Sequence, residues 1–233
     1  MTGPGPLAGA RRITFVTGAG ISRESGIPTF RGREGLWRNH DASKLATVAA
    51  FERDPGLVWE WYLERRRGAL AAEPNAGHLA VAAAERAAEV RVVTQNIDGL
   101  HGRAGSSRVI ELHGNITRTR CSSCSGDWEG DLPGMPPRCG CGGLLRPDVV
   151  WFGEALGAAE WGAAAEAASW CDAMVIAGTS LAVSPANTLP LAARRAGATL
   201  VEVNTEETPM SYMMDASLRG TCSEELPRLV ERL

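Results

Sequence analysis

Residues 12–20 read RITFVTGAG, and no other stretch says more about the fold. The first six residues are mostly apolar or β-branched, which is typical of a buried strand, and glycines follow at Gly18 and Gly20. A glycine turn after a strand lets backbone N–H groups approach the phosphates of a dinucleotide. The third glycine of the usual G-x-G-x-x-G pattern is absent, since Arg23 occupies its position, so an ordinary strand–turn–helix also fits these residues alone.

Segments of similar character recur along the chain. Short apolar stretches typical of strands lie at 90–94, 109–113, 149–152, 173–177 and 199–203. Between them lie segments with helical patterns, at 42–71 with a break near Asp54-Pro55, 77–88, 158–170, 185–196 and 223–232. Strands that alternate with helices predict an α/β fold with a doubly wound, Rossmann-like parallel sheet. Ligands of such sheets bind at the carboxyl ends of the strands, where this chain has its polar and glycine-rich residues.

Four of the six cysteines are paired by spacing, as Cys121-x-x-Cys124 and Cys139-x-Cys141. The segment that carries them is rich in Gly, Pro and Ser and has little apolar material, so it needs a cross-link to fold. Four thiolates are the ligand set of a closed tetrahedral zinc site, with no position open for water. We therefore predict one structural zinc per chain, in preference to disulfides, which a reducing compartment disfavours.

The composition is that of an ordinary globular protein, with 44% hydrophobic and 22% charged residues among 233. The formal net charge of −3 gives no reason to expect direct nucleic-acid binding, which normally requires a basic face. No apolar run approaches the ~20 residues that span a bilayer, so no membrane association is expected. The first residues, MTGPGPLAGARR, lack the apolar centre of a signal peptide, and a cytoplasmic location is expected.

Six motifs in register resemble those of the sirtuins, the NAD-dependent protein lysine deacylases. The family's NAD-binding signature and its second and third motifs are similar to GAGISRESGIPTFRG at 18–32, TQNIDGLH at 94–101 and ELHG at 111–114. In the family's order there follow RPDVVWFGE at 146–154, GTS at 178–180 and VN at 203–204. The resemblance implies a single sirtuin-type catalytic domain over 1–233. Within it we expect a Rossmann-like NAD domain at about 11–34, 76–118 and 146–233, a helical module at about 35–75 and a zinc-binding module at about 119–145.

The resemblance also implies which residues bind the cofactor NAD. These are Gly18, Ala19, Gly20, Ile21, Ser22, Phe30, Arg31, Gln95, Asn96, Ile97, Asp98, Gly178, Thr179, Ser180, Asn204 and Cys222. Among them Asn96 and Asp98 are assigned to the nicotinamide carboxamide, whereas Phe30 and Arg31 are assigned to a loop that closes over the reacting ribose. Taken without the family, Asn-x-Asp is an ordinary turn and Cys222 is a small apolar filler.

The family likeness makes His113 the general base, with Asn96 as the second catalytic residue. In the reaction that the resemblance implies, the acyl oxygen attacks the anomeric carbon of the ribose as nicotinamide leaves, and His113 then takes a proton from a ribose hydroxyl. The expected products are nicotinamide, free lysine and O-acyl-ADP-ribose. A lone histidine at a strand end is usually structural, so the role of His113 rests mainly on the family motif.

Tyr62 and Arg65 lie three residues apart in EWYLERRR at 60–67. On a helix these positions share one face, where a phenol and a guanidinium would bind a carboxylate, although the pair alone also fits a solvated helix. The bacterial sirtuin branch that contains the mitochondrial desuccinylase type has a Tyr-x-x-Arg pair in its acyl-lysine tunnel, and the resemblance adds Val150 and Phe152 as substrate-binding residues. We therefore expect removal of succinyl, malonyl or glutaryl groups, and of acetyl as a secondary activity, from lysine in proteins or peptides.

Three other functions would use the same residues. A general protein deacetylase would not depend on an acyl carboxylate, a mono-ADP-ribosyltransferase or NAD glycohydrolase would pass the ribosyl group to another acceptor, and a non-catalytic module would only bind NAD or ADP-ribose. Product identity with and without acyl-peptide separates the enzymes, and nicotinamide release excludes the binding module. The complete set of His113, Asn96 and Asp98 argues against that module.

Overall fold

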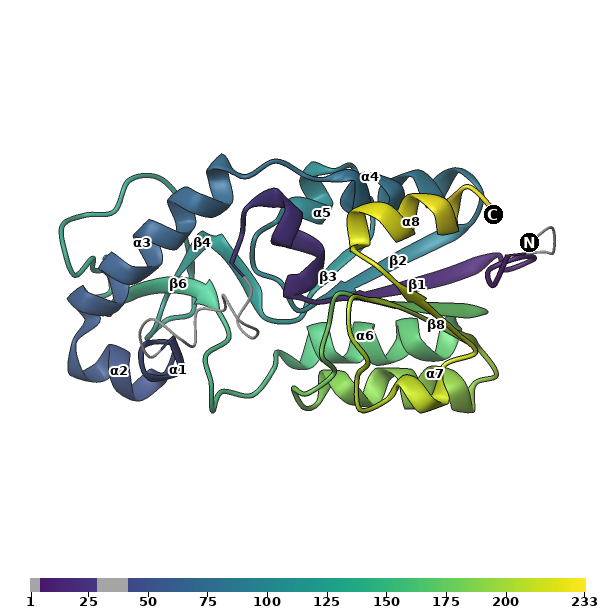
Figure 1. The fold of residues 1–233 in the computed structure, drawn as a ribbon. Coiled ribbons are helices and arrows are strands. Elements are labelled where there is room, and N and C mark those ends of the chain that lie inside the picture. Colours follow the sequence, from purple (N-terminus) through teal and green to yellow (C-terminus); the bar gives the residue numbers. More distant parts are fainter. Residues whose placement is uncertain (1–4, 29–41) are drawn as a thin grey trace.

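The structure is a computed structural model and describes residues 5–28 and 42–233. Its centre is a six-stranded parallel sheet with the order β3-β2-β1-β7-β8-β9 (Figure 1). The strands are β1 (Arg12–Thr17), β2 (Glu89–Thr94), β3 (Val109–Glu111), β7 (Ala173–Ala177), β8 (Thr199–Asn204) and β9 (Ala216–Arg219). The chain builds one half of the sheet from β1 outwards and the other half from β7 outwards, so the strand order reverses between β1 and β7. This confirms the predicted α/β fold and defines the switch point at which such sheets bind ligands.

Helices cover both faces of this sheet (Figure 1). They are α4 (Ala76–Ala83) and α8 (Cys222–Val230) on one face, and α6 (Ala158–Trp170) and α7 (Leu189–Arg195) on the other. Neighbouring residues of β1 serve the two faces: Phe15 packs in the cluster with α4 and α8, and Val16 in the cluster with α6 and α7. Because the central strands are buried on both faces, their sequences are mostly apolar or β-branched, which made them recognisable in the sequence.

A smaller unit lies beside the large sheet, on the left of Figure 1. Its antiparallel sheet has the order β5-β4-β6. The unit consists of α1 (Ala42–Leu45), α2 (Val48–Arg53), α3 (Pro55–Ala71), β4 (Gly114–Cys121), β5 (Asp127–Trp128) and β6 (Leu145–Val149). Trp59 of α3 is fully buried against Ile116 and Leu145, and its indole N–H donates to the Leu145 carbonyl oxygen over 2.8 Å. The helix is thereby fixed to the small sheet.

Short helical segments complete the chain. They are η1 (Ala19–Ser25), η3 (Ala84–Arg86), α5 (Leu100–Arg103), η4 (Ala186–Thr188) and η5 (Ser211–Met213). None of the helices within the described ranges has the length and apolar character needed to cross a membrane.

The strand predicted at 149–152 was wrong in both position and partner. The structure has β6 at Leu145–Val149, and this strand pairs antiparallel with β4 in the small sheet instead of joining the parallel sheet. The polar and proline residues at 146–148 concealed the strand. The strands β4 and β9 were missed for a related reason, since their sequences, GNITRTRC and ASLR, contain few apolar residues.

The predicted helical region at 42–71 is three separate helices. Thr47 caps α2, because its hydroxyl oxygen accepts from the Ala50 N–H over 3.1 Å. Asp54 caps α3 in the same way, accepting from the Leu57 N–H over 3.0 Å, and Pro55 occupies the first turn. Side-chain oxygens that accept from early helical N–H groups favour a new helix start over a continuous helix. The break expected near Asp54-Pro55 is thus present, and the one at Thr47 was missed.

Candidate active site

The carboxyl ends of β1, β2, β7 and β8 carry the residues predicted to bind NAD. The Gln95 side-chain amide donates to the Thr179 hydroxyl over 3.0 Å, and the Asn204 amide donates to the Thr179 carbonyl oxygen over the same distance. Thr179 therefore joins the ends of β2 and β8 to the turn that follows β7. Ser180, the next residue, is exposed, so its hydroxyl is accessible from solvent.

Two glycine turns touch in this site, one after β1 and one after β7. A Cβ on Gly20 would lie 2.7 Å from the Gly178 Cα, and a Cβ on Gly178 would overlap the backbone nitrogen of Ile21. Gly178 also has a φ of 62°, which side chains disfavour. Gly18 is buried in this contact and Ala19 is half-buried. The glycines therefore let the two turns pack backbone against backbone at the carboxyl ends of β1 and β7, the place where a sheet of this type binds a dinucleotide.

Ser22, Asn96 and Asp98 form a buried polar cluster next to these turns. The Ser22 hydroxyl donates to Asp98 Oδ2 over 2.7 Å and accepts from the Asn96 amide over 3.0 Å. Asn96 also donates to the Gly18 carbonyl oxygen over 3.1 Å. Burial raises the pKa of Asp98, against the lowering effect of hydrogen bonds from Leu100 and Ser22. Both N–H groups of the Asn96 amide are thus used within the site, and the cluster brings an amide and a carboxylate side chain next to each other.

Two buried histidines to which the sequence analysis assigned no role lie behind this cluster. His78 Nε2 is 3.4 Å from the Ser22 hydroxyl oxygen, and the His78 and His101 rings are 5.0 Å apart. His101 Nε2 is 2.9 Å from the Thr17 hydroxyl oxygen. Burial lowers the pKa of His78 to about 4 and that of His101 to about 3, so both rings are neutral. The sequence did contain a signal for a structural position of His78, because it follows Asn75 by three residues, the spacing of a capping box, and the two residues form that box at the start of α4.

His113 lies on the connection from β3 to β4 and is half-buried. Its Nδ1 is 2.8 Å from the Gln95 carbonyl oxygen, and because a carbonyl can only accept, the proton is on Nδ1. Nε2 then has the lone pair that a general base needs. Burial lowers the pKa of His113 below the ordinary 6.5, although the hydrogen bond to Gln95 opposes this, so the ring is neutral at neutral pH. Tautomer and charge both suit proton abstraction.

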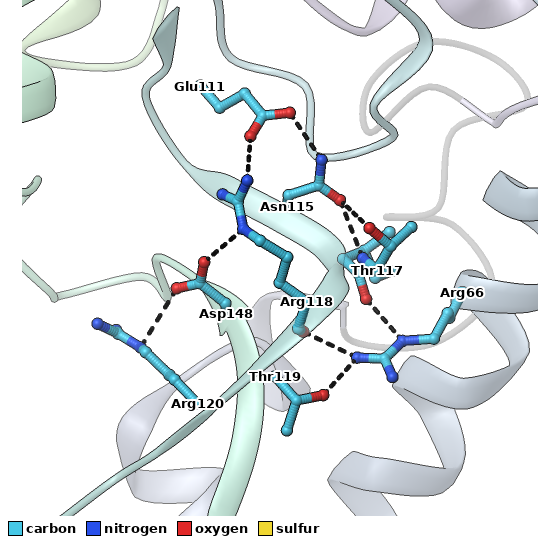
Figure 2. A network of polar contacts seen from close by, with 9 residues as sticks. Arg66, Glu111, Asn115, Thr117, Arg118, Thr119, Arg120 and Asp148 are labelled. Carbon is cyan, nitrogen blue, oxygen red and sulfur yellow. Dashed lines mark hydrogen bonds and ion pairs between the residues drawn. The ribbon is translucent and has the colours of Figure 1, made fainter. Parts of the chain in front are cut away.

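A polar network holds the segment around His113 (Figure 2). Arg118 of β4 forms ion pairs with Glu111 over 2.8 Å and with Asp148 of β6 over 2.9 Å. Glu111 also accepts from the Asn115 amide over 2.7 Å. Because Glu111 and Asn115 lie two residues before and after His113, the network attaches both flanks of the histidine to the small sheet. Arg118 is half-exposed, so these pairs add little stability and act mainly on orientation.

Tyr62 is buried on α3, with only 3% of its surface exposed. Its hydroxyl oxygen accepts from the indole N–H of Trp151 over 2.9 Å. Within the described ranges no residue accepts the hydrogen of this hydroxyl. Burial raises the pKa of the phenol, so Tyr62 stays protonated and its hydrogen remains available to a ligand.

Arg65, one helical turn further along α3, is half-buried without an acidic partner among the described residues. Its guanidinium carbon lies 3.4 Å from the centroid of the Trp61 ring, its Nη1 donates to the Trp61 carbonyl oxygen over 3.4 Å, and its Nε is buried with no hydrogen-bond partner. Burial lowers the pKa of Arg65. The adjacent Arg66, by contrast, donates to the Ile116 carbonyl oxygen over 2.7 Å and to two further acceptors of β4. Arg67 is exposed to solvent. Of the three consecutive arginines, Arg65 is therefore the one that is placed to receive an anion.

The segment after β6 alternates between core and surface. Trp151 is 2% exposed, whereas Phe152 is 47% exposed. The backbone N–H of Val150 donates to the His113 carbonyl oxygen over 2.9 Å, which joins the segment predicted to bind substrate to the residue predicted to be the base. Val150 and Phe152 were predicted to bind substrate, but Trp151, whose indole contacts Tyr62, was not. The alternating pattern with a large aromatic residue on the inner face was the available signal.

The other residues predicted to contact NAD are less closely tied to the cluster. Ile97 is half-buried at the edge of the apolar cluster under α3. Cys222 is buried at the start of α8, and burial raises the pKa of its thiol to about 12, so the thiol is protonated. Phe30 and Arg31 lie outside the described residues.

The four paired cysteines come together at the end of the small sheet. Their sulfur atoms all lie within 4.8 Å of one another, with Cys121 to Cys141 at 3.5 Å and Cys124 to Cys139 at 3.9 Å. Zinc–sulfur bonds of ~2.3 Å in a tetrahedron place the sulfurs roughly 3.8 Å apart. Backbone N–H groups of Cys124 and Ser123 lower the pKa of Cys121 to about 6, which favours the thiolate. The cluster fits a structural zinc.

Comparison with known proteins agrees with this geometry. A model of the Sir2 family matches residues 18–185. An NAD-dependent protein deacylase of Aeropyrum pernix is 52% identical over 227 residues, which cover 96% of this chain and 93% of that protein. A solved structure of a Sir2 homologue in complex with NAD has a TM-score of 0.90 at 43% identity, covering 97% of this chain and 90% of the other. A Sir2 structure with a p53 peptide and NAD⁺ has a TM-score of 0.85 at 34% identity, covering 97% and 95%. Since the family model spans well over half of the chain, this protein belongs to the Sir2 family.

Proposed function

We propose that this Sir2-family enzyme, an NAD-dependent protein deacylase, acts preferentially on lysine acyl groups that end in a carboxylate, namely succinyl, malonyl and glutaryl. The observation that carries the proposal is Arg65, a half-buried cation without an acidic partner in the described part of the chain. It lies one helical turn from Tyr62, whose hydroxyl hydrogen is also unused there. Acetyl-lysine is then a secondary substrate.

The charge of Arg65 explains the preference. A cation removed from water loses solvation, and an anionic partner restores part of that loss. A succinyl or malonyl carboxylate supplies this partner, whereas the methyl group of acetyl leaves Arg65 as it is in the free enzyme. The guanidinium also stacks on Trp61, which limits its orientations before any ligand binds.

The residues at the ends of β1 and β2 would hold the nicotinamide ribosyl part of NAD. Bound NAD supplies an electrophilic ribose carbon and a nicotinamide leaving group. Asn96 and Asp98 would orient the carboxamide. The Ser22 hydroxyl holds the two side chains together, since it donates to Asp98 and accepts from Asn96. His113 would take the ribose hydroxyl proton through its free Nε2.

The zinc module would hold the small sheet together without taking part in the reaction. Four thiolates leave no coordination position for water or substrate. Cys121 belongs to β4, the strand that also carries Arg118, so the cluster is connected through one strand to the network around His113.

Steady-state kinetics on one peptide that carries acetyl-, malonyl-, succinyl- or glutaryl-lysine tests the proposal. We expect the kcat/KM for the acidic acyl groups to exceed that for acetyl by about tenfold or more, which corresponds to one charge-assisted hydrogen bond. O-Acyl-ADP-ribose should form with nicotinamide, and nicotinamide release should depend on the acyl-peptide. Equal rates on acetyl and succinyl peptides would make the enzyme a general deacetylase, and release of nicotinamide without peptide would make it an NAD glycohydrolase.

A further inference from the structure

The hydrogen bond from Trp151 to Tyr62 joins two segments that lie 89 residues apart in the sequence. A phenol oxygen donates one hydrogen and accepts at its lone pairs. Conjugation with the ring keeps the O–H bond near the ring plane, so the hydrogen has two favoured positions, one on each side of the C–O axis. An indole N–H that points at the oxygen from one side repels the hydroxyl hydrogen to the other side.

Trp151 is itself held in one orientation. The Arg146 guanidinium carbon lies 3.5 Å from the centroid of its ring, and the Phe51 ring packs against it with a centroid separation of 5.0 Å. The backbone N–H of Trp151 donates to Glu154 over 2.7 Å. Arg146 in turn binds both carboxylate oxygens of Glu154, over 2.6 and 2.8 Å. The indole N–H is therefore a fixed donor, and it can impose its direction on the phenol.

We propose that Trp151 is a positioning residue for acyl selectivity, because its indole N–H directs the hydroxyl hydrogen of Tyr62 towards the carboxylate of an acidic acyl group. The inference rests on the proposed preference for such groups and adds the residue that prepares Tyr62 for it. A hydroxyl with a fixed direction loses less rotational freedom when it binds the carboxylate. Acetyl-lysine has no carboxylate and gains nothing from this orientation.

Trp59 offers a matched control for the test. It is also a fully buried tryptophan of the small unit, and its indole N–H likewise makes one hydrogen bond, but to the Leu145 carbonyl oxygen instead of to Tyr62. Trp151→Phe and Trp59→Phe therefore delete the same group from the same apolar cluster. They differ in whether the lost N–H contacts Tyr62.

The measured quantity is the ratio of kcat/KM for succinyl-lysine to that for acetyl-lysine on one peptide. Trp151→Phe should lower this ratio by about two- to tenfold, the effect of one lost neutral hydrogen bond, whereas Trp59→Phe should change both substrates alike and leave the ratio near wild type. In a Tyr62→Phe background, Trp151→Phe should lower the ratio no further, because both substitutions remove the same hydrogen bond between Trp151 and Tyr62. A purely structural role of Trp151 would lower the melting temperature and both rates together.

A second variant covers the case in which Trp151→Phe does not fold. Site-specific incorporation of 3-benzothienylalanine at position 151 keeps the shape of the indole and replaces the N–H by sulfur, and it should lower the ratio to a similar extent. A wild-type ratio near one would overturn the proposed function and this inference with it. A high wild-type ratio that survives the loss of the indole N–H, or that falls equally in Trp59→Phe, would overturn this inference alone.

Discussion

Three consecutive arginines of α3 have three different environments. Arg66 uses its guanidinium on backbone and hydroxyl oxygens of β4, Arg67 is exposed, and Arg65 is half-buried against Trp61. The sequence singled out Arg65 only by its spacing from Tyr62, together with the family resemblance. The structure adds the physical reason, since among these three residues Arg65 is the one with a buried nitrogen atom that lacks a hydrogen-bond partner.

The charge state of His113 leads to a prediction about pH. A base must be neutral to accept a proton, and burial lowers the pKa of His113 below 6.5. Deacylation should therefore stay constant around neutral pH and decline only as the pH falls through this lowered pKa. The measurement is kcat/KM for a succinyl-peptide as a function of pH, and an acidic limb centred at or above pH 7 would contradict the assignment.

The variant His113→Ala should lose roughly 10²–10⁴ in rate, as expected for removal of a general base. Its melting temperature should remain near that of the wild type, because the side chain makes one hydrogen bond, to the Gln95 carbonyl oxygen. Unchanged turnover in a folded His113→Ala variant would show that another group takes the proton.

At the scale of elements, the cysteine cluster compensates for a segment with almost no core of its own. The first cysteine pair lies at and just after the end of β4, and the second pair lies shortly before β6. A bound metal would therefore join these antiparallel strands at the point where their hydrogen bonding ends. In apo form such segments are commonly unfolded, because metal binding supplies their folding free energy.

Metal analysis should accordingly find about one zinc per chain, and a chelator should lower the melting temperature. Cys124→Ser removes one ligand and should abolish stoichiometric zinc. Cys171→Ser is the matched control, since this buried thiol lies outside the cluster and bonds the Ala168 carbonyl oxygen. Active, folded protein without stoichiometric metal would rule out the structural role.

The central strands that the sequence predicted correctly are buried on both faces. The strands around Phe15 and Val175 are runs of apolar or β-branched residues, so the pattern alone identified them. By contrast, Pro147 and its charged neighbours in β6 give no strand pattern, and the pairing of that strand depends on β4, about 30 residues earlier. Such pairing is a tertiary property, which a local pattern cannot reveal.

For the whole molecule, the candidate active site is built from segments that are far apart in the chain. Ser22 meets Asn96 and Asp98, His113 meets Gln95, and Tyr62 meets Trp151. The family motifs had named most of these residues as site candidates, and the structure brings these candidates into contact. The contacts between them were not predictable, since neither the tautomer of a histidine nor the partner of a phenol is encoded in spacing.

The central claim is that Arg65 selects acidic acyl groups, and one substitution tests it most directly. Arg65→Met removes the guanidinium and roughly keeps the length of the side chain, and Arg67→Met is the matched control on the exposed neighbour. The measurement is kcat/KM of both variants on succinyl- and acetyl-lysine in the same peptide. Arg65→Met should lower the succinyl value by roughly ten- to 150-fold, the loss of a charge-assisted hydrogen bond, while acetyl stays near wild type and Arg67→Met changes neither. An equal loss on both substrates in Arg65→Met would contradict the account and make Arg65 a structural residue.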